Sequence, residues 1–126
     1  MDRSGLNPGN IMGLYILDAA GEPVEEPDVL KWGDWLNGGD RRIARDELPD
    51  GYVVSTVFLG IDHGFGGVLG DRAPILYETM VFNDCGSLDQ DWAFDRYETR
   101  QQALEGHQAV LVELKLHLAE KAAHGQ

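Results

Sequence analysis

The 126 residues of the chain are enough for one domain, and a formal net charge of −12 results from 22 acidic residues against 10 basic ones. Apolar residues make up 43% of the sequence, well above the composition of a disordered chain. The acidic balance argues against direct nucleic-acid binding, because phosphate contacts need clustered Lys and Arg. No run approaches the roughly 20 apolar residues of a membrane helix, so we expect a cytoplasmic protein without membrane contact.

The first eleven positions, residues 1–11, contain turn-forming residues and no apolar period. They predict a disordered leader before a single α+β domain over residues 12–126. A first strand is predicted over Gly13–Asp18, with a turn at 19–23 after it. An acidic patch without any basic residue follows, made of Asp18, Glu22, Glu25, Glu26 and Asp28. The acidic surface that the net charge of the whole chain implies either secures solubility or competes with nucleic acid for a basic partner protein.

A first helix is predicted from Pro27 to the glycine pair Gly38-Gly39. Proline suits the first helical position, acidic residues favour the positive helix N-terminus, and the glycines end the helix. Apolar residues recur at helical spacing, with Trp32 and Trp35 among them. Two interpretations of the tryptophans stay open, because each suits either the edge of a core or an aromatic contact with a ligand.

Three strands are predicted in the middle of the chain. The run Arg41–Arg45 is interpreted as an edge strand, and Pro49-Asp50-Gly51 predicts a tight turn after it. The run Tyr52–Ile61 is rich in β-branched residues, and Ile75–Phe82 mirrors its pattern. Apolar residues alternate on both sides of Tyr52–Ile61, which predicts that both faces of this strand are largely covered.

The last predicted elements are a strand over Asp91–Tyr97 and a helix from Thr99 to about Ala122. Thr99 and Gln102 form a T-x-x-Q capping box, and Gly106 allows close approach to the sheet. The stripe expected to be buried is Ala103, Leu104, His107, Val110, Leu111, Leu114 and Leu118. The order β-α-β-β-β-β-α predicts a two-layer α+β fold, with two helices on a mostly antiparallel sheet of about five strands.

Four residues are candidates for a chemical site, namely Asp62, His63, Glu78 and His107. Glu78 stands on an apolar strand face, where a carboxylate needs solvent, a cation or hydrogen-bond donors. Carboxylates and imidazoles together can bind a divalent metal, with all four residues as ligands. Glu78, His63 and His107 are alternatively candidates for acid–base catalysis. Their spacing matches no established metal-binding motif.

Each candidate also has a structural interpretation. Glu78 can form a buried ion pair with Arg72, Arg96 or His107. His63 can hydrogen-bond the backbone of the loop that follows it, and His107 on an apolar stripe suits a core histidine with satisfied hydrogen bonds. Only the positions of these side chains in space decide between a site and a scaffold.

A glycine-rich connection, Gly60–Pro74, joins the two longest strands and carries the bulky Phe65. Loops of this length in a compact domain usually bind something or move, although a flexible hairpin tip is the simpler interpretation. The candidate binding residues are Asp62, His63, Phe65, Trp32 and Trp35.

Four segments stand out between residues 12 and 112, namely LYILDAAGEPVEEPD, VSTVFLGIDHGFG, LYETMVF and YETRQQALEGHQAV. Together with Trp32 and Asp40-Arg41-Arg42, they resemble a family of small uncharacterised proteins common in bacteriophage and prophage genomes. The resemblance implies no activity. Members of that family run from HxFGGGPP directly into the next strand, whereas VLGDRA intervenes here, which argues against one fixed loop geometry.

Three classes of function are compatible with these features. The leading hypothesis is an acidic binding or interaction module of bacteriophage type, in the host cytoplasm if viral, that inhibits a host protein or sequesters a small ligand. The alternatives are a hydrolase that uses a divalent metal held by the four candidate site residues, and a structural virion component. The oligomeric state stays open.

Overall fold

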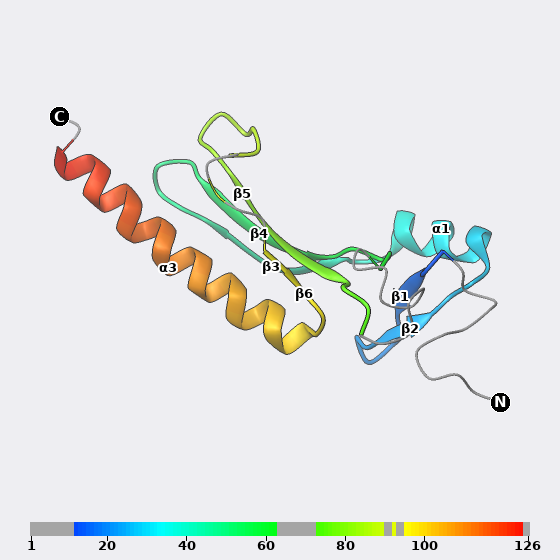
Figure 1. The fold of residues 1–126 in the computed structure, drawn as a ribbon. Helices are drawn as coiled ribbons and strands as arrows, with labels where there is room; N and C mark the ends of the chain where they lie inside the picture. Colours follow the sequence, from blue (N-terminus) through cyan, green and yellow to red (C-terminus); the bar gives the residue numbers. More distant parts are fainter. Residues whose placement is uncertain (1–11, 63–72, 90–91, 93–94, 125–126) are drawn as a thin grey trace.

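The computed structural model describes residues 12–62, 73–89, 92 and 95–124, and it has an α+β fold with two antiparallel sheets (Figure 1). In chain order the elements are β1 (Tyr15–Leu17), β2 (Pro23–Glu25), α1 (Val29–Gly38), β3 (Arg42–Glu47), β4 (Val53–Phe58), β5 (Tyr77–Phe82), β6 (Asp95–Tyr97) and α3 (Arg100–His124). The predicted fold class is confirmed, with six strands in the described residues where about five were expected. The predicted leader, residues 1–11, lies outside the described residues.

The larger sheet has the strand order β3-β4-β5-β6, and each pair of neighbours is antiparallel. β3 lies at the edge of this sheet, as predicted for Arg41–Arg45. The predicted turn joins β3 to β4, with the Gly51 N–H donating to the Leu48 carbonyl over 2.9 Å. Gly51 has φ of +96°, a backbone conformation in which a side chain would be strained.

α3 runs across one face of the larger sheet and continues past the sheet toward the C-terminus (Figure 1). The core between the helix and the sheet contains Leu48, Val54, Val81, Val110, Leu111 and Leu114. On β4 the residues that face α3 are buried, namely Val54, Thr56 and Phe58, while Val53, Ser55 and Val57 are only half-buried. α3 packs on the first face of β4, which is therefore the more deeply buried of the two.

α3 begins with the predicted capping box. The Gln102 N–H donates to Thr99 Oγ1 over 3.0 Å, and Gln102 Oε1 accepts from the N–H groups of Glu98 and Thr99. One turn later, a methyl group on Gly106 would overlap the ring of Tyr97, which confirms that glycine permits the close approach of α3 to β6. The expected stripe is buried at Ala103, His107, Val110, Leu111 and Leu114, and half-buried at Leu104 and Leu118.

The second sheet is a two-stranded ribbon of β1 and β2, in which Tyr15 pairs with Glu25 and Leu17 with Pro23. It is joined to the end of β4 by the Tyr15 N–H, which donates to the Gly60 carbonyl over 2.9 Å. β2 corrects the prediction, which assigned these residues to a turn and an acidic patch. A three-residue strand that includes proline and glutamate has little intrinsic β propensity. β2 is therefore a strand only because it pairs with β1.

α1 begins two positions later than predicted. Val29, rather than Pro27, is the first helical residue, and the side chain of Asp28 accepts hydrogen bonds from the N–H groups of Leu30 and Lys31 as the N-cap. Gly39 follows the helix, as predicted, and a side chain there would overlap Trp35. No residue of α1 is fully buried. Within the described ranges, no helix combines the length and apolarity needed to cross a membrane.

Candidate functional site

Asp62 lies at the base of the glycine-rich connection. Its N–H donates to the Gly13 carbonyl, and its Oδ1 accepts from the Ile75 N–H, both over 2.9 Å. Asp62 is thereby tied to two neighbouring segments, through its backbone to Gly13 and through its carboxylate to Ile75, and it is only 7% exposed. The hydrogen bond from Ile75 to Asp62 holds the two ends of the glycine-rich connection together.

Glu78 lies on the face of β5 that points away from α3. It is directly opposite Arg96 in the register of β5 and β6, and Arg96 Nε donates to Glu78 Oε2 over 2.9 Å. Glu78 is 7% exposed, so this cross-strand ion pair supplies the cation that its position requires. The structural alternative of an ion pair with Arg96 is confirmed.

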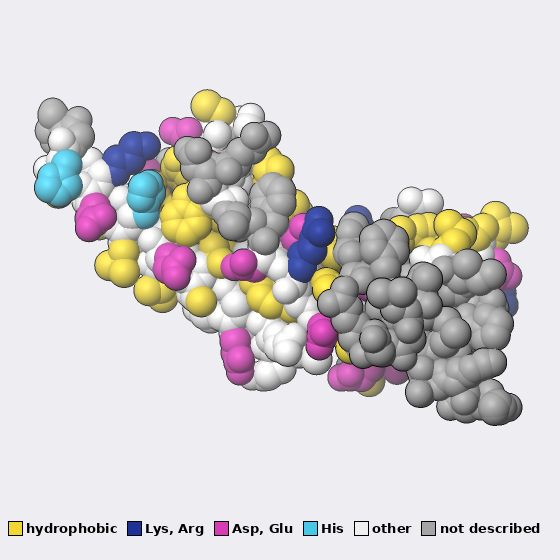
Figure 2. Space-filling model, in the orientation of Figure 1, with side chains coloured by type: hydrophobic (Ala, Val, Ile, Leu, Met, Phe, Trp, Pro, Cys, Tyr) yellow, Lys and Arg dark blue, Asp and Glu magenta, His cyan; other side chains and the backbone are white. Residues whose placement is uncertain are grey.

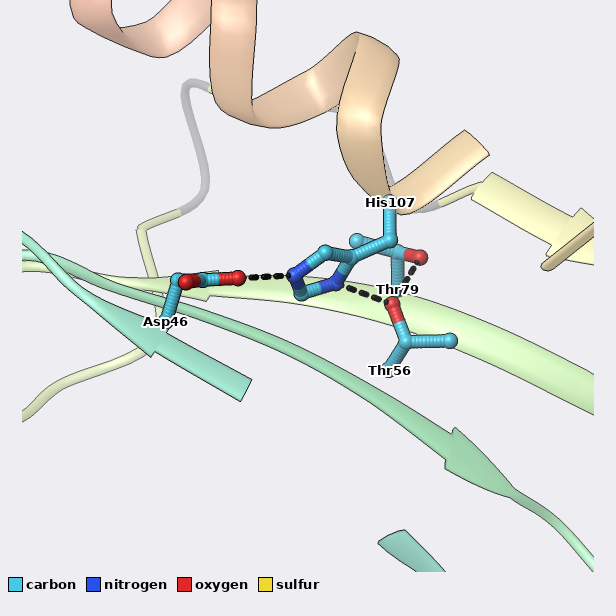
Figure 3. Close-up of polar contacts among 4 residues, drawn as sticks. All are labelled: Asp46, Thr56, Thr79 and His107. Carbon is cyan, nitrogen blue, oxygen red and sulfur yellow. Dashed lines mark hydrogen bonds and ion pairs between the residues drawn. The ribbon is translucent and has the colours of Figure 1, made fainter. Parts of the chain in front are cut away.

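His107 points from α3 into the opposite face of the sheet, where it is fully buried. Its Nδ1 lies 2.8 Å from Thr56 Oγ1, and its Nε2 lies 2.7 Å from Asp46 Oδ2 (Figure 3). Thr56 Oγ1 is 2.6 Å from Thr79 Oγ1, and Tyr97 donates its hydroxyl to Thr79 over 3.1 Å. The side chains of β3, β4, β5, β6 and α3 are thus joined in one polar network.

One assignment of donors and acceptors satisfies every contact of this network. Because Tyr97 donates to Thr79, the Thr79 hydroxyl is free to donate to Thr56, and Thr56 in turn to His107 Nδ1. The remaining proton on His107 Nε2 then reaches the carboxylate of Asp46. In this assignment each hydrogen is used once, and the chain ends at Asp46, whose side chain is 48% exposed. In this assignment His107 accepts at Nδ1 and donates from Nε2.

The series of hydroxyl, imidazole and carboxylate has the composition of a hydrolase triad. A nucleophile must, however, reach a substrate carbonyl, and Thr56 is fully buried with its oxygen against Thr79. Its contacts are those of a core residue. The network cross-links α3 to the sheet, and each of its hydrogen bonds contributes a net stabilisation of about 0.5–1.5 kcal/mol.

Three of the four predicted site residues, Asp62, Glu78 and His107, are not brought together in the described structure. Glu78 and His107 lie on opposite faces of the sheet, because neighbouring residues of a strand alternate and Thr79 faces His107. Asp62 is engaged at the base of the loop, and His63 and Phe65 lie outside the described residues. Among the residues that the structure describes, no group of three or more His, Cys, Asp or Glu side chains is placed to hold a metal ion.

Trp32 and Trp35 attach α1 to the rest of the molecule. Trp32 Nε1 donates to the Gly60 carbonyl over 2.9 Å. Trp35 meets Phe58 edge-on, with ring centroids 5.8 Å apart. Both are half-buried, which agrees with the interpretation of these residues as the edge of the core.

Sequence reasoning missed Asp46 and Thr56 as partners of His107, and Thr79 as the partner of Thr56. The sequence does contain a signal for the two threonines. Each lies in a strongly apolar strand, and the residues two positions before and after it, on the same face of the strand, are apolar.

Burial raises the pKa of Tyr97, and its hydrogen bond with Thr79 opposes that increase.

Comparison of the chain with protein-family models, with curated proteins and with solved structures gives no match. The bacteriophage-type resemblance therefore stays a prediction.

Proposed function

We propose that the protein is an interaction module that binds a basic partner protein through α1. The observation that carries this proposal is the apolar surface of α1, where Val29 is 47% and Leu30 78% exposed. Figure 2 shows a row of hydrophobic side chains along this helix. Exposed neighbouring apolar residues on a helix are typical of a contact surface rather than of a solvated face.

The charge around α1 indicates the chemistry of the partner. Residues 18–40 contain seven acidic residues and one lysine, a net charge of −6 that is half of the −12 of the whole chain. Four of these acids also make local hydrogen bonds, since Asp18 caps the β1–β2 turn, Glu26 accepts from the Asp28 N–H, Asp28 caps α1, and Asp40 accepts from the Arg42 N–H. A partner that places an apolar side chain within a ring of Lys and Arg would match this surface.

A competitor of nucleic acid is a special case of the same proposal, because a basic nucleic-acid-binding surface would meet the acids around α1. If the protein is of bacteriophage type, the partner is a host protein in the host cytoplasm. The hydrolase alternative gains no support, since Asp62, Glu78 and His107 do not form one site. A virion component stays a prediction, and copurification with particles tests it.

The proposal is tested by selecting binders from a random 12-residue peptide library. We expect the enriched peptides to combine Lys or Arg with apolar residues, and their affinity to decrease steeply with salt because the attraction between charges is screened. A double variant, Val29→Gln and Leu30→Gln, keeps helix propensity and should lose at least ~10-fold in affinity through lost apolar contact.

The matched control is Val112→Gln, which replaces an equally exposed apolar residue of α3 and should bind the selected peptides normally. Enrichment of acidic or purely apolar peptides, or equal affinity for the double variant and the wild-type protein, would contradict the proposal. Thermal unfolding of both variants checks that the fold is intact.

A further inference from the structure

We propose that the outer face of α3 pairs with α3 of a second copy of the chain in a parallel, two-stranded coil. The outer face consists of residues at alternating spacings of three and four, all of them exposed, namely Ala109, Val112, Leu116, Ala119 and Ala123. Val112 is 55% and Leu116 64% exposed. We call these five residues the α3 seam.

The seam is separate from the side of α3 that packs on the sheet. At about 100° per residue, Val112 points roughly opposite to Leu114, which is fully buried in the core. Figure 2 shows hydrophobic side chains along the edge of α3 that faces away from the sheet. A second helix can therefore pack on the seam without moving any residue of the fold.

The spacing is the a and d pattern of a coiled coil, with Ala109, Leu116 and Ala123 at a, and Val112 and Ala119 at d. Three alanines allow the two helix backbones to approach closely, and Val112 and Leu116 supply the larger apolar contact. The d position before Val112 is occupied by Glu105. Two glutamates facing each other there would repel, so the apolar seam ends after this position. The seam thus covers two heptads, which predicts a dimer in rapid exchange rather than a permanent one.

The charges beside the seam decide the orientation. Glu113 and Glu120 lie at e positions on one side, and Lys115 lies at a g position on the other. In a parallel coil each Lys115 faces Glu120 of the second copy, which gives two symmetry-related ion pairs. An antiparallel coil would instead place the glutamates of the two copies against each other. Charge complementarity therefore favours the parallel arrangement.

Disulfide trapping tests the proposal in the full chain. In a Cys85→Ser background, which removes the exposed native thiol, Val112→Cys should form a covalent dimer at least ~10-fold faster than Lys121→Cys, because residues at a d position of a parallel coil face their own counterparts. Lys121 is exposed on the same helix but lies at an f position, which points away from the partner helix.

Equal rates for the two cysteine variants would overturn the pairing. Fast cross-linking only in a mixture of Val112→Cys with Leu116→Cys would show an antiparallel coil, in which d positions face a positions, and overturn the orientation.

Charge reversal provides a second readout that does not depend on cysteine. By sedimentation velocity, Lys115→Glu should weaken self-association, and adding Glu120→Lys should restore it. Leu116→Gln should weaken it at least ~10-fold through lost apolar contact and leave peptide binding at α1 unchanged. The Val29→Gln and Leu30→Gln variant should still self-associate. Failure of this inference and failure of the proposed function are therefore distinguishable.

Discussion

The two helices of this protein are held in different ways. α3 buries five side chains in the described structure, and one of these, His107, joins it to the sheet through hydrogen bonds. α1 buries none completely and is held by the Asp28 cap, the hydrogen bond from Trp32 and the edge contact of Trp35. The contrast indicates that α3 is part of the hydrophobic core, whereas α1 is attached at the periphery. The apolar side chains of Val29 and Leu30 on α1 stay exposed and are available to contact a partner.

Regions with few buried contacts open locally more readily than the core, and binding surfaces are often drawn from them. On this basis a substitution in α3 should change the stability of the whole molecule. An equivalent substitution in α1 should change only the local stability of that helix.

The largest effect is expected for His107→Ala. This change removes two hydrogen bonds, leaves the Thr56 hydroxyl without its acceptor and opens a cavity in the core, at a total cost of about 3 kcal/mol in the free energy of unfolding. Denaturant unfolding measures this cost. Gln108→Ala, the exposed neighbour on the same helix, is the control and should remain within ~0.5 kcal/mol of the wild-type protein.

A double-mutant cycle then tests the network itself. Because His107 and Thr56 share a hydrogen bond, Thr56→Val should cost less in the His107→Ala background than alone. Strictly additive losses, or a loss below ~1 kcal/mol for His107→Ala, would show that the network does not hold α3 as we describe.

A smaller loss of stability is expected from removing the N-cap side chain of either helix. The two losses should differ in which part of the molecule they affect. Asp28→Ala and Thr99→Ala should each cost about 1 kcal/mol, because each removes a side-chain acceptor for N–H groups at a helix N-terminus. In native-state hydrogen exchange, Asp28→Ala should speed the exchange of amides in α1 alone. Thr99→Ala should lower the free energy of global unfolding and so speed exchange throughout the core. Faster exchange throughout the sheet in Asp28→Ala would contradict the distinction between the two helices.

The parts predicted from sequence are those with local signals. Thr99 and Gln102 lie within one turn of each other, so the cap of α3 depends on nothing distant. β4 and β5 have unambiguous β composition. β2 was missed because only its pairing with β1 makes it a strand.

The candidate site was harder to predict for the same reason. Glu78 and His107 were correctly selected as polar residues in apolar surroundings, but their partners depend on strand register and helix placement. Asp46 is separated from His107 by 61 residues of sequence, and Thr56 by 51. Arg96 was one of three alternatives for Glu78, and only the β5–β6 register selects it.

The smallest expected effect concerns two tyrosines near the junction of the two regions. Tyr77 is fully buried, and its hydroxyl is the one buried side-chain polar atom in the described part of the chain without a hydrogen-bond partner. Tyr97, in contrast, donates to Thr79 at the start of the His107 network. The same substitution should therefore have opposite effects: Tyr77→Phe stabilises by up to ~1 kcal/mol at neutral pH, and Tyr97→Phe destabilises by about 1 kcal/mol.

Alkaline pH tests the same assignment independently. Burial raises the pKa of Tyr77, the charge of Glu22 raises it further, and Arg100 opposes the increase. Because the folded pKa lies above the unfolded value of about 10, stability is fully present below that pH and decreases as the pH increases through the folded pKa. Tyr77→Phe should make the decline in unfolding free energy above about pH 10 shallower. Tyr97, Tyr15 and Tyr52, whose pKa values burial also raises, contribute to the remaining decline. Destabilisation by Tyr77→Phe at neutral pH would mean that the hydroxyl has a partner in solution, and that the junction between α1 and α3 is more polar than the structure indicates.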